Sequence, residues 1–312
     1  MITESGPSPE LIETIDGRAA EAGVRVRLHA ADLDGPREVG IGADEPVVSA
    51  SVFKVPVAVE LARQGAVGEL DLGERITVPP GPPAPGSYGL ATFRHEVTMS
   101  WFDLAVLMIG VSDNVATDLV LGKVGKPAVA ESLRRLGLPR TAVPLDCAEL
   151  IRTIGEDLAP GEDFAPGKDF GTGDEDDEPV LTELSPAQLA RLRVLMPERT
   201  CRTTAAESTR LLGLIWRDEA APAAACADVR RWLEFQVWPH RLRSGFPDGV
   251  KVSGKTGTLP SVRNEIGVVE YPDGGRYAVA VFTQADDARS MVPERDAFIG
   301  FAAARAVEWL RR

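Results

Sequence analysis

Strand-like patterns lie near the two ends of this chain, and helical patterns fill the residues between them. Near the start, Val24–Leu28 alternates apolar and polar side chains, as a half-buried strand does, and Glu38–Gly42 is a second short candidate. Near the end, a Pro-Asp-Gly-Gly turn joins two of three further candidates as a hairpin. These are Val250–Gly257, Glu265–Tyr271 and Tyr277–Thr283. The simplest fold is one antiparallel sheet built from both ends of the chain, with helices on its faces.

Apolar residues recur at helical spacing through the middle of the chain, beginning with the largely apolar stretch Val52–Arg63. Helices are also predicted after Pro9 and Ser100, at Val115–Leu121, Ala128–Leu136, Ala205–Trp216 and Val229–Val237, and at Asp296–Leu310. We therefore expect an α/β protein of the α+β type with two lobes. Residues 1–50 and 217–312 would form the lobe that carries the sheet, and residues 51–216 an inserted helical lobe. A cleft between two such lobes is a natural site for a small molecule.

The chain is acidic, with a formal net charge of −13, so the phosphates of a nucleic acid would repel it. No apolar run approaches the roughly 18 residues of a membrane span. The first residues, MITESGPSPELIE, have neither the basic nor the apolar region of an export signal. We therefore expect no nucleic-acid partner, no membrane segment and a cytoplasmic location. The sequence leaves the oligomeric state open.

The cysteines and histidines do not form a metal-binding pattern. The three cysteines, Cys147, Cys201 and Cys226, have no C-x-x-C spacing, and the histidines, His29, His95 and His240, are scattered along the chain. Buried or half-exposed free thiols are the favoured interpretation, with a disulfide or a reactive cysteine as the alternative. We expect no metal and no cofactor.

The first chemical motif is Ser51-Val52-Phe53-Lys54, at the start of the apolar helix. A spacing of three places the serine hydroxyl and the lysine amine on one face of a turn, where the amine can accept the hydroxyl proton. A helix N-terminus adds N–H groups that stabilise an oxyanion. By itself the pattern also fits a surface serine and lysine. The apolar residues around Lys54 make a fully solvated lysine less favourable.

Two further motifs follow along the chain. Ser112–Asn114 reads S-D-N between two helical patterns, where it could also serve as a turn or a helix N-cap. Lys255–Thr258 reads K-T-G-T on a predicted strand, where a lysine could also protect a sheet edge. With S-x-x-K, in the contexts of helix start, interhelical turn and strand, they make up the motif set of class A β-lactamases and penicillin-binding proteins.

The sequence resembles that family beyond the three motifs. Ser100–Leu119 is similar to the family's helix, turn and helix around S-D-N, and Arg243–Pro247 and Lys255–Val269 are similar to its C-terminal strands. The resemblance covers most of the chain, with an acidic stretch as the main insertion. It implies the β-lactamase-like fold, with an inserted helical lobe, and a serine hydrolase that works through an acyl enzyme.

The resemblance also implies roles for individual residues. Ser51 would be acylated by a carbonyl substrate, Lys54 would take part in its deprotonation, and Ser112 would pass a proton to the leaving nitrogen. Lys255 would attract a substrate carboxylate and lower the pKa of Lys54 by like-charge proximity. The main-chain N–H groups of Ser51 and Thr258 would form the oxyanion hole. Substrate binding would fall to Asn114, Thr256 and Gly257, and to Arg263 either as a second cation or as a surface arginine without a role.

Hydrolysis of the acyl enzyme needs a base, and Glu149 is the candidate, either as that base or as a solvated glutamate at a helix end. Leu145–Glu149 resembles the start of the family's base-carrying loop. Thr153 then replaces the asparagine that holds the water in the family. Behind it, Gly155–Glu178 is acidic and rich in glycine and proline, so we expect an insertion at about 155–180 that forms a flexible surface loop or a lid on the cleft.

Three functions fit these residues. The first is a β-lactamase or related hydrolase that attacks an amide, lactam or ester carbonyl, in a small-molecule substrate that also bears a carboxylate. The second is a cytoplasmic acyltransferase or esterase of small-molecule biosynthesis with the same acyl-enzyme chemistry. The third is a lactam-binding module without turnover, which the intact set of polar residues disfavours.

Overall fold

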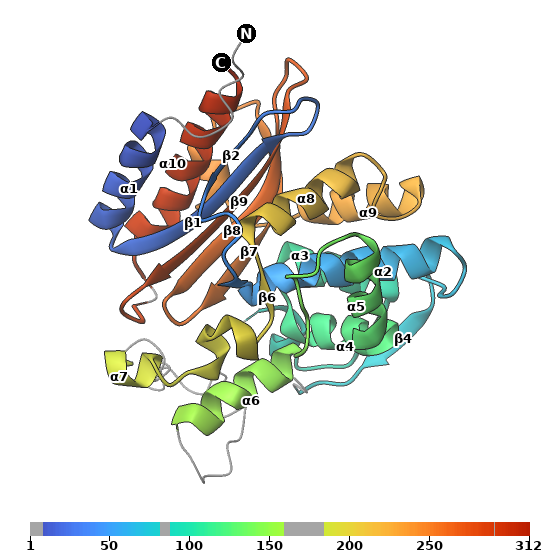
Figure 1. Cartoon of the computed structure of the whole chain (residues 1–312). Helices are drawn as coiled ribbons and strands as arrows, with labels where there is room; N and C mark the ends of the chain where they lie inside the picture. Colours follow the sequence, from blue (N-terminus) through green and yellow to red (C-terminus); the bar gives the residue numbers. More distant parts are fainter. Residues whose placement is uncertain (1–8, 82–87, 159–183, 290) are drawn as a thin grey trace.

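Five strands form one antiparallel sheet in the computed structural model, which describes residues 9–81, 88–158, 184–289 and 291–312. Their order is β2-β1-β9-β8-β7, so two strands from the start of the chain stand beside three from its end (Figure 1). The strands are β1 (Val24–Asp32), β2 (Glu38–Ile41), β7 (Lys251–Leu259), β8 (Val262–Glu270) and β9 (Arg276–Ala285). The prediction of a single antiparallel sheet built from both chain ends is confirmed.

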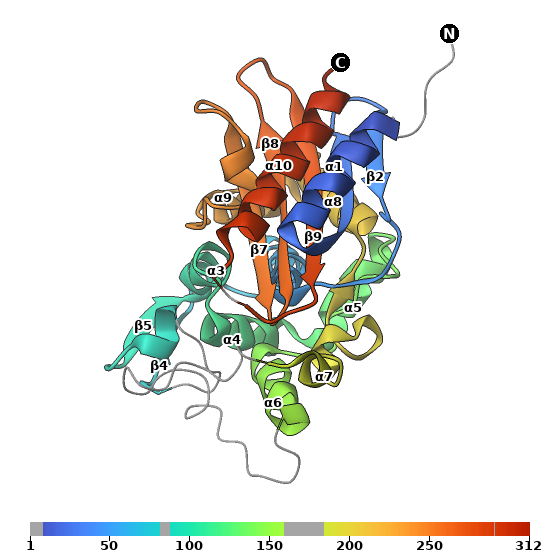
Figure 2. The same cartoon turned by 90° about the vertical axis from the view of Figure 1, so that its left-hand side faces the viewer.

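Helices cover both faces of this sheet (Figures 1 and 2). On one face lie α1 (Pro9–Ala22) and α10 (Pro293–Leu310), which bury a cluster of apolar side chains against β1 and β9. On the other face, α8 (Ala205–Trp216) packs on β1, β8 and β9. Apolar side chains on this second face, such as Ile266 and Ala280, belong to a larger cluster that continues into the other helices. The sheet therefore separates two cores.

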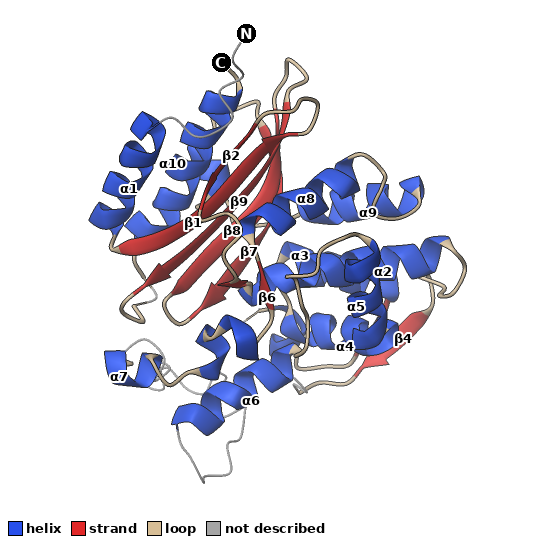
Figure 3. Ribbon diagram, in the orientation of Figure 1, coloured by secondary structure: helices blue, strands red, loops and turns tan. Residues whose placement is uncertain are grey.

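The remaining helices form a second group, and one of them packs on β7, an edge strand of the sheet (Figure 3). They are α2 (Lys54–Ala66), α3 (Trp101–Gly110), α4 (Asn114–Val124), α5 (Lys126–Arg135), α6 (Cys147–Leu158), the short α7 (Pro186–Leu189) and α9 (Ala223–Glu234). In this group α2 is central, since it contacts α3, α4, α5 and α9. Nearly all of its residues are buried, as the apolar pattern of the sequence predicted.

Short elements complete the fold. Two small antiparallel pairs are β3 (Val47–Val48) with β6 (Arg202–Thr203) and β4 (Arg75–Val78) with β5 (Val97–Ser100). The 3-10 turns are η1 (Ala50–Phe53), η2 (Gly89–Thr92), η4 (Arg193–Leu195), η5 (Pro197–Arg199) and η6 (Leu242–Gly245). Of these, η1 contacts β7 and leads directly into α2. Most of the acidic stretch predicted to be a loop lies outside the described residues.

Candidate active site

Ser51 lies in the 3-10 turn η1, immediately before α2. The preceding residue, Ala50, has a φ of 46°, a left-handed conformation that costs a non-glycine residue about 1 kcal/mol or more. Pro56 falls in the first turn of α2, where its missing N–H breaks no helical hydrogen bond. The serine of S-x-x-K is thus held in a strained turn directly before the first residue of a buried helix.

Lys54 points into the protein and has no exposed surface. Its Nζ donates to Ser112 O at 2.6 Å and to Asn114 Oδ1 at 2.9 Å, and lies 3.3 Å from Ser112 Oγ. Burial lowers the pKa of the Lys54 ammonium, and the acidic groups near it offset only part of that effect. The contacts bring the S-x-x-K motif and the S-D-N motif together, although 58 residues separate Lys54 from Ser112 in the chain.

The S-D-N turn is fixed from two sides. Ser112 has a φ of 65°, a second strained position. Asp113 caps α4 by accepting from Ala116 N at 2.9 Å, and its other oxygen accepts from Leu90 N at 2.7 Å. The side chain of Asp113 therefore orients the turn that presents Ser112 and Asn114 to Lys54.

Lys255 is the second fully buried lysine of the site and lies on the edge strand β7. Its Nζ donates to Thr256 O at 2.9 Å. Burial lowers the pKa of Lys255 well below its ordinary value, and repulsion from Lys54 lowers it further. The charge of Lys54 therefore acts on Lys255, while the converse effect, that Lys255 lowers the pKa of Lys54, stays a prediction.

Gly257 brings β7 against the nucleophile turn. A Cβ at this position would lie 2.7 Å from Ser49 O and 3.3 Å from Ser51 N, so a side chain larger than hydrogen would press on the turn. Thr256 is buried, and its main-chain N–H donates to Gln236 Oε1 at 2.6 Å, whereas Thr258 is exposed. The strand that carries K-T-G-T therefore runs beside Ser51.

Arg241 supports this strand, and the sequence analysis did not identify it. Its guanidinium donates to Gly257 O and Asn264 O, both at 3.0 Å, and to Thr258 Oγ1 at 2.9 Å, while Asp296 accepts from Nε at 2.6 Å. Arg241 is only 4% exposed, so its guanidinium contacts Thr258 from the interior of the protein. Its partners lie far away along the chain, so no local pattern marks this residue.

Glu265 is a second residue that the motifs do not reveal. It is fully buried and accepts from Leu242 N at 2.7 Å and from the amide of Gln236, whose oxygen in turn holds Thr256 N. Burial raises the pKa of Glu265 to about 7, against the effect of these donors. Glu265 thus supports the edge strand through one intervening side chain.

Glu149 does not reach Lys54 by any hydrogen bond or ion pair of the described residues. It lies in the first turn of α6, pairs with Lys126 and accepts from Asp146 N at 2.8 Å. Partial burial opposes its charge, but Lys126 and the amide of Asp146 outweigh that effect and keep the pKa of Glu149 below its usual value. Thr153 donates to Glu149 O at 2.8 Å.

Asp118 faces the same loop from α4. Its carboxylate accepts from Cys147 N at 2.7 Å and from Ala148 N at 2.9 Å, which fixes the start of α6. Burial raises the pKa of Asp118 to about 6, despite these two donors. Asp118 also attracts the charge of Lys54, which partly offsets the effect of burial on that lysine.

Arg263 lies directly opposite Thr258 in the β7–β8 pair. Its guanidinium donates to Val262 O at 2.8 Å and Leu259 O at 3.1 Å, at the turn between the two strands, and it is only 7% exposed. The structure therefore places Arg263 as a buried residue at a strand turn rather than on the surface. The cation that contacts Thr258 is Arg241.

Neither a metal cluster nor a membrane span occurs in the described part of the chain. No three His, Cys, Asp or Glu side chains gather there as metal ligands, and no described helix is both long and apolar enough to cross a bilayer. The three cysteines are free and buried, so the thiols take part in packing.

The chain is similar to known proteins over nearly its whole length. The model of a family described as the β-lactamase enzyme family matches residues 10–310. The chain is 28% identical to the β-lactamase regulatory protein BlaB of Streptomyces cacaoi, over 97% of this chain and 98% of that protein. It is 26% identical to a β-lactamase of Bacillus licheniformis, over 84% of this chain and 72% of that protein.

Solved structures share the fold. A β-lactamase from Sphaerobacter thermophilus superposes with a TM-score of 0.72 at 23% identity, and the match covers 96% of each chain. A mutant of PBP-A, solved as an acyl-enzyme complex with penicillin G, superposes with a TM-score of 0.75 at 18% identity, over 100% of this chain and 99% of that one. At these identities the likeness concerns the fold.

Proposed function

Since the chain belongs to the β-lactamase enzyme family and is a serine hydrolase, we propose that it forms an acyl enzyme at Ser51 with a lactam, amide or ester that bears a carboxylate. The observation that carries this proposal is the buried Lys54, which follows Ser51 by one turn and binds Ser112 and Asn114. A lysine held without solvent close to a serine is suited to act as a base.

In the proposed reaction, Ser51 Oγ attacks the carbonyl carbon while Lys54 accepts its proton. A neutral amine has two N–H donors and one lone pair. The two short contacts of Lys54, to Ser112 O and Asn114 Oδ1, use both donors and leave the lone pair for the proton. Burial lowers the pKa of Lys54, which favours the neutral amine that this proton transfer requires.

The other residues complete the acylation step. Ser112 passes the proton to the leaving nitrogen, and the main-chain N–H groups of Ser51 and Thr258 stabilise the oxyanion. Lys255 and Thr256 attract the substrate carboxylate, supported by Arg241 through Thr258. The amide group of Asn114 and the main chain near Gly257 bind the rest of the substrate.

Mass spectrometry of the intact protein tests the nucleophile. Incubation with a penicillin should add the mass of one penicillin, and Ser51→Ala should remove the adduct, whereas the control Ser185→Ala, at the exposed start of α7, should retain it. An adduct that survives Ser51→Ala means that the nucleophile is misassigned. Lys255→Ala should slow acylation by the penicillin more than acylation by an uncharged ester. Equal losses contradict its role with the carboxylate.

A lactam-binding protein with little turnover is the second candidate. It is favoured by the pairing of Glu149 with Lys126, which occupies the carboxylate that would activate water. The similarity to a regulatory protein agrees with it. A chromogenic cephalosporin distinguishes the two. A burst equal to the enzyme concentration followed by a stall supports the binding protein, and steady multiple turnover supports the hydrolase.

A further inference from the structure

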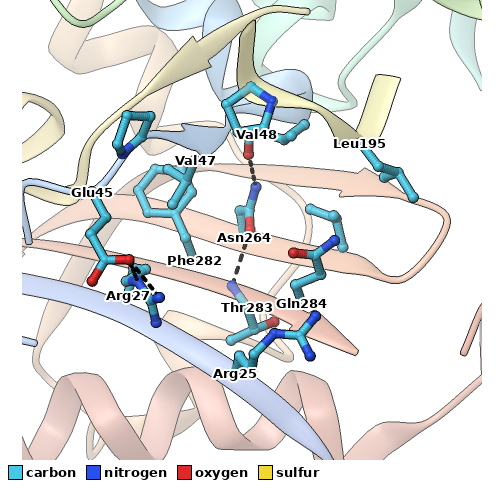
Figure 4. Close-up of a pocket in the computed structure, with 13 residues that line it drawn as sticks. Arg25, Arg27, Glu45, Val47, Val48, Leu195, Asn264, Phe282, Thr283 and Gln284 are labelled. Carbon is cyan, nitrogen blue, oxygen red and sulfur yellow. Dashed lines mark hydrogen bonds and ion pairs between the residues drawn. The ribbon is translucent and has the colours of Figure 1, made fainter. Parts of the chain in front are cut away.

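A second cavity lies behind the nucleophile turn, against one face of the sheet (Figure 4). Its volume is about 120 Å³, and residues of β1, β3, β8 and β9, together with η4, η5 and the segment before β3, line it. This volume is somewhat smaller than that of an apolar cavity of ~150 Å³ that holds benzene, so the size limits a ligand to one small ring or a short chain. The motif residues Ser51, Lys54, Ser112 and Lys255 do not line it, so it is distinct from the candidate active site.

The floor of the cavity consists of two rows of side chains that cross three strands. Arg25 lies opposite Gln284, which lies opposite Val262. In the second row, Arg27 lies opposite Phe282, which lies opposite Asn264. Directly opposed residues of an antiparallel pair point to the same face of a sheet, so both rows face the cavity. Each row runs from an arginine on β1 to a residue on β8, the strand next to the edge strand β7.

The charges of the lining favour an anion. The cavity is lined by two arginines and one carboxylate, that of Glu45, in a chain whose net charge is −13. Glu45 accepts from Arg27 Nε at 2.7 Å, and Asp286 pairs with Arg25 at 2.6 Å. The second pair is largely exposed, and such pairs contribute little, so a ligand carboxylate can take the place of Asp286.

The rest of the lining favours an apolar body. Phe282 and Val262 are buried in the floor, and Val47, Leu195 and Pro197 form the opposite wall. Figure 4 shows Arg25 and Gln284 on the same side of the cavity as Asn264, with Val47 and Leu195 on either side of Val48 above them. We propose that this cavity is a binding site for a small carboxylate with an apolar ring, and that its occupancy changes the reactivity of Ser51.

The connection to Ser51 runs through Asn264. Its Nδ2 donates to Val48 O at 2.9 Å and to Ser49 O at 3.3 Å, and its Oδ1 accepts from Thr283 N at 3.2 Å. Across the sheet, Asn264 lies opposite Gly257, the glycine that packs against Ser51 N. The second row therefore continues from Arg27 to the main chain of the nucleophile, and a ligand that shifts Asn264 also shifts the turn that carries Ser51.

Benzoate is a suitable probe for binding, with benzamide as its uncharged counterpart. Calorimetry should detect benzoate, and the double change Arg25→Gln and Arg27→Gln should weaken it roughly tenfold or more, the value of one charge-assisted hydrogen bond. Arg18→Gln, which removes an arginine from an exposed pair on α1, should not change the affinity. Leu195→Trp, which fills the cavity, should abolish binding. Because this variant keeps both arginines, it tests the site even if the arginine variant fails to fold.

Lys255→Ala separates this cavity from the active site, which also attracts carboxylates. Benzoate affinity should be unchanged in Lys255→Ala if the ligand occupies the second cavity. Loss of binding in Lys255→Ala, equal binding of benzamide, or full affinity in the arginine variant would each overturn the proposal. This arm does not depend on acylation, so it remains informative if the proposed function fails.

The influence on Ser51 rests on the proposed function and is measured separately. The rate of acylation by a penicillin should change at least about twofold when benzoate saturates the wild-type cavity, and should not change in Leu195→Trp. If benzoate binds but the rate is the same, the connection through Asn264 is refuted while the binding site stands. If no adduct forms without benzoate, the proposed function is refuted instead.

Discussion

The side chain of Glu149 pairs with Lys126 and accepts a hydrogen bond from the amide of Asp146. These contacts limit what the residue can contribute to turnover. A working general base typically supplies about 10²-fold or more. Because Glu149 is already paired and its pKa is lowered, we expect Glu149→Gln to reduce the turnover of a cephalosporin by far less than that. Steady-state kinetics measures the effect, with Glu131→Gln as the control, since Glu131 pairs with Arg134 on the exposed face of α5. A loss of about 100-fold or more would show that Glu149 is the base.

The buried Glu265 makes a prediction about pH. Its pKa is about 7 in the folded protein and near 4.5 in the unfolded chain, so between these values the folded state holds a proton that the unfolded state has released. Stability must therefore fall as the pH rises through this range, by up to about 3 kcal/mol from this group. Urea unfolding near pH 5 and pH 8 should show a smaller difference in Glu265→Gln than in wild type. The substitution itself is expected to lower stability at both pH values, because the new amide offers one acceptor to two donors. An unchanged difference would mean that Glu265 keeps its charge in the fold.

At the scale of elements, the sequence predicted those whose stabilising contacts are local. The bounds of α8 match the predicted Ala205–Trp216, and Ser100, after which the sequence predicts a helix, caps α3 by accepting from Asp103 N. The sequence analysis did not predict α6 as a helix. Its first amides bond to Asp118, some 29 residues earlier in the chain, so the local pattern does not contain its cap. The pair β4 and β5 was missed for a similar reason, since four-residue strands depend on their partner.

The residues of the candidate site also fall into those that a local pattern predicts and those that depend on contacts with distant parts of the chain. Ser51 and Lys54 share one turn, so their spacing alone brings them together. The convergence of Lys54 with Ser112 could be anticipated only from the resemblance of the whole motif set. Arg241 donates hydrogen bonds to Gly257 and Thr258 from another part of the chain. It belongs to no sequence motif, so the sequence alone does not distinguish it from the other arginines.

The contact of β7 with η1 predicts the effect of a side chain at Gly257. In Gly257→Ala the new Cβ would meet Ser49 O and Ser51 N, both main-chain atoms, so the nucleophile turn must move. We expect acylation by a penicillin to slow at least about tenfold, since small displacements of reacting groups have large effects on rate. Stopped-flow kinetics checks this, with Gly122→Ala in α4 as the control, because a Cβ there meets nothing within 4 Å. A rate within twofold of wild type would show that the strand does not set the position of Ser51.

At the scale of the whole molecule, the sheet keeps the two cores apart. We therefore expect a substitution in one core to lower stability alone, and a substitution in the other core to lower both stability and the rate of acylation. The core on the α1 and α10 side contains none of the hydrogen-bond partners found for Lys54 and Lys255 among the described residues, whereas α2 belongs to the other core and carries Lys54 itself. Ile15→Ala on α1 and Leu61→Ala on α2 each remove a fully buried side chain, so each should cost about 2–5 kcal/mol. Denaturant unfolding measures that cost. Below the unfolding transition, Ile15→Ala should acylate at the wild-type rate, because the cavity it leaves is separated from Ser51 by the sheet. Leu61→Ala should acylate more slowly, since relaxation around its cavity tilts the helix that positions Lys54. Equal losses of rate in both variants would mean that the two cores respond as one unit and that the sheet does not insulate the site.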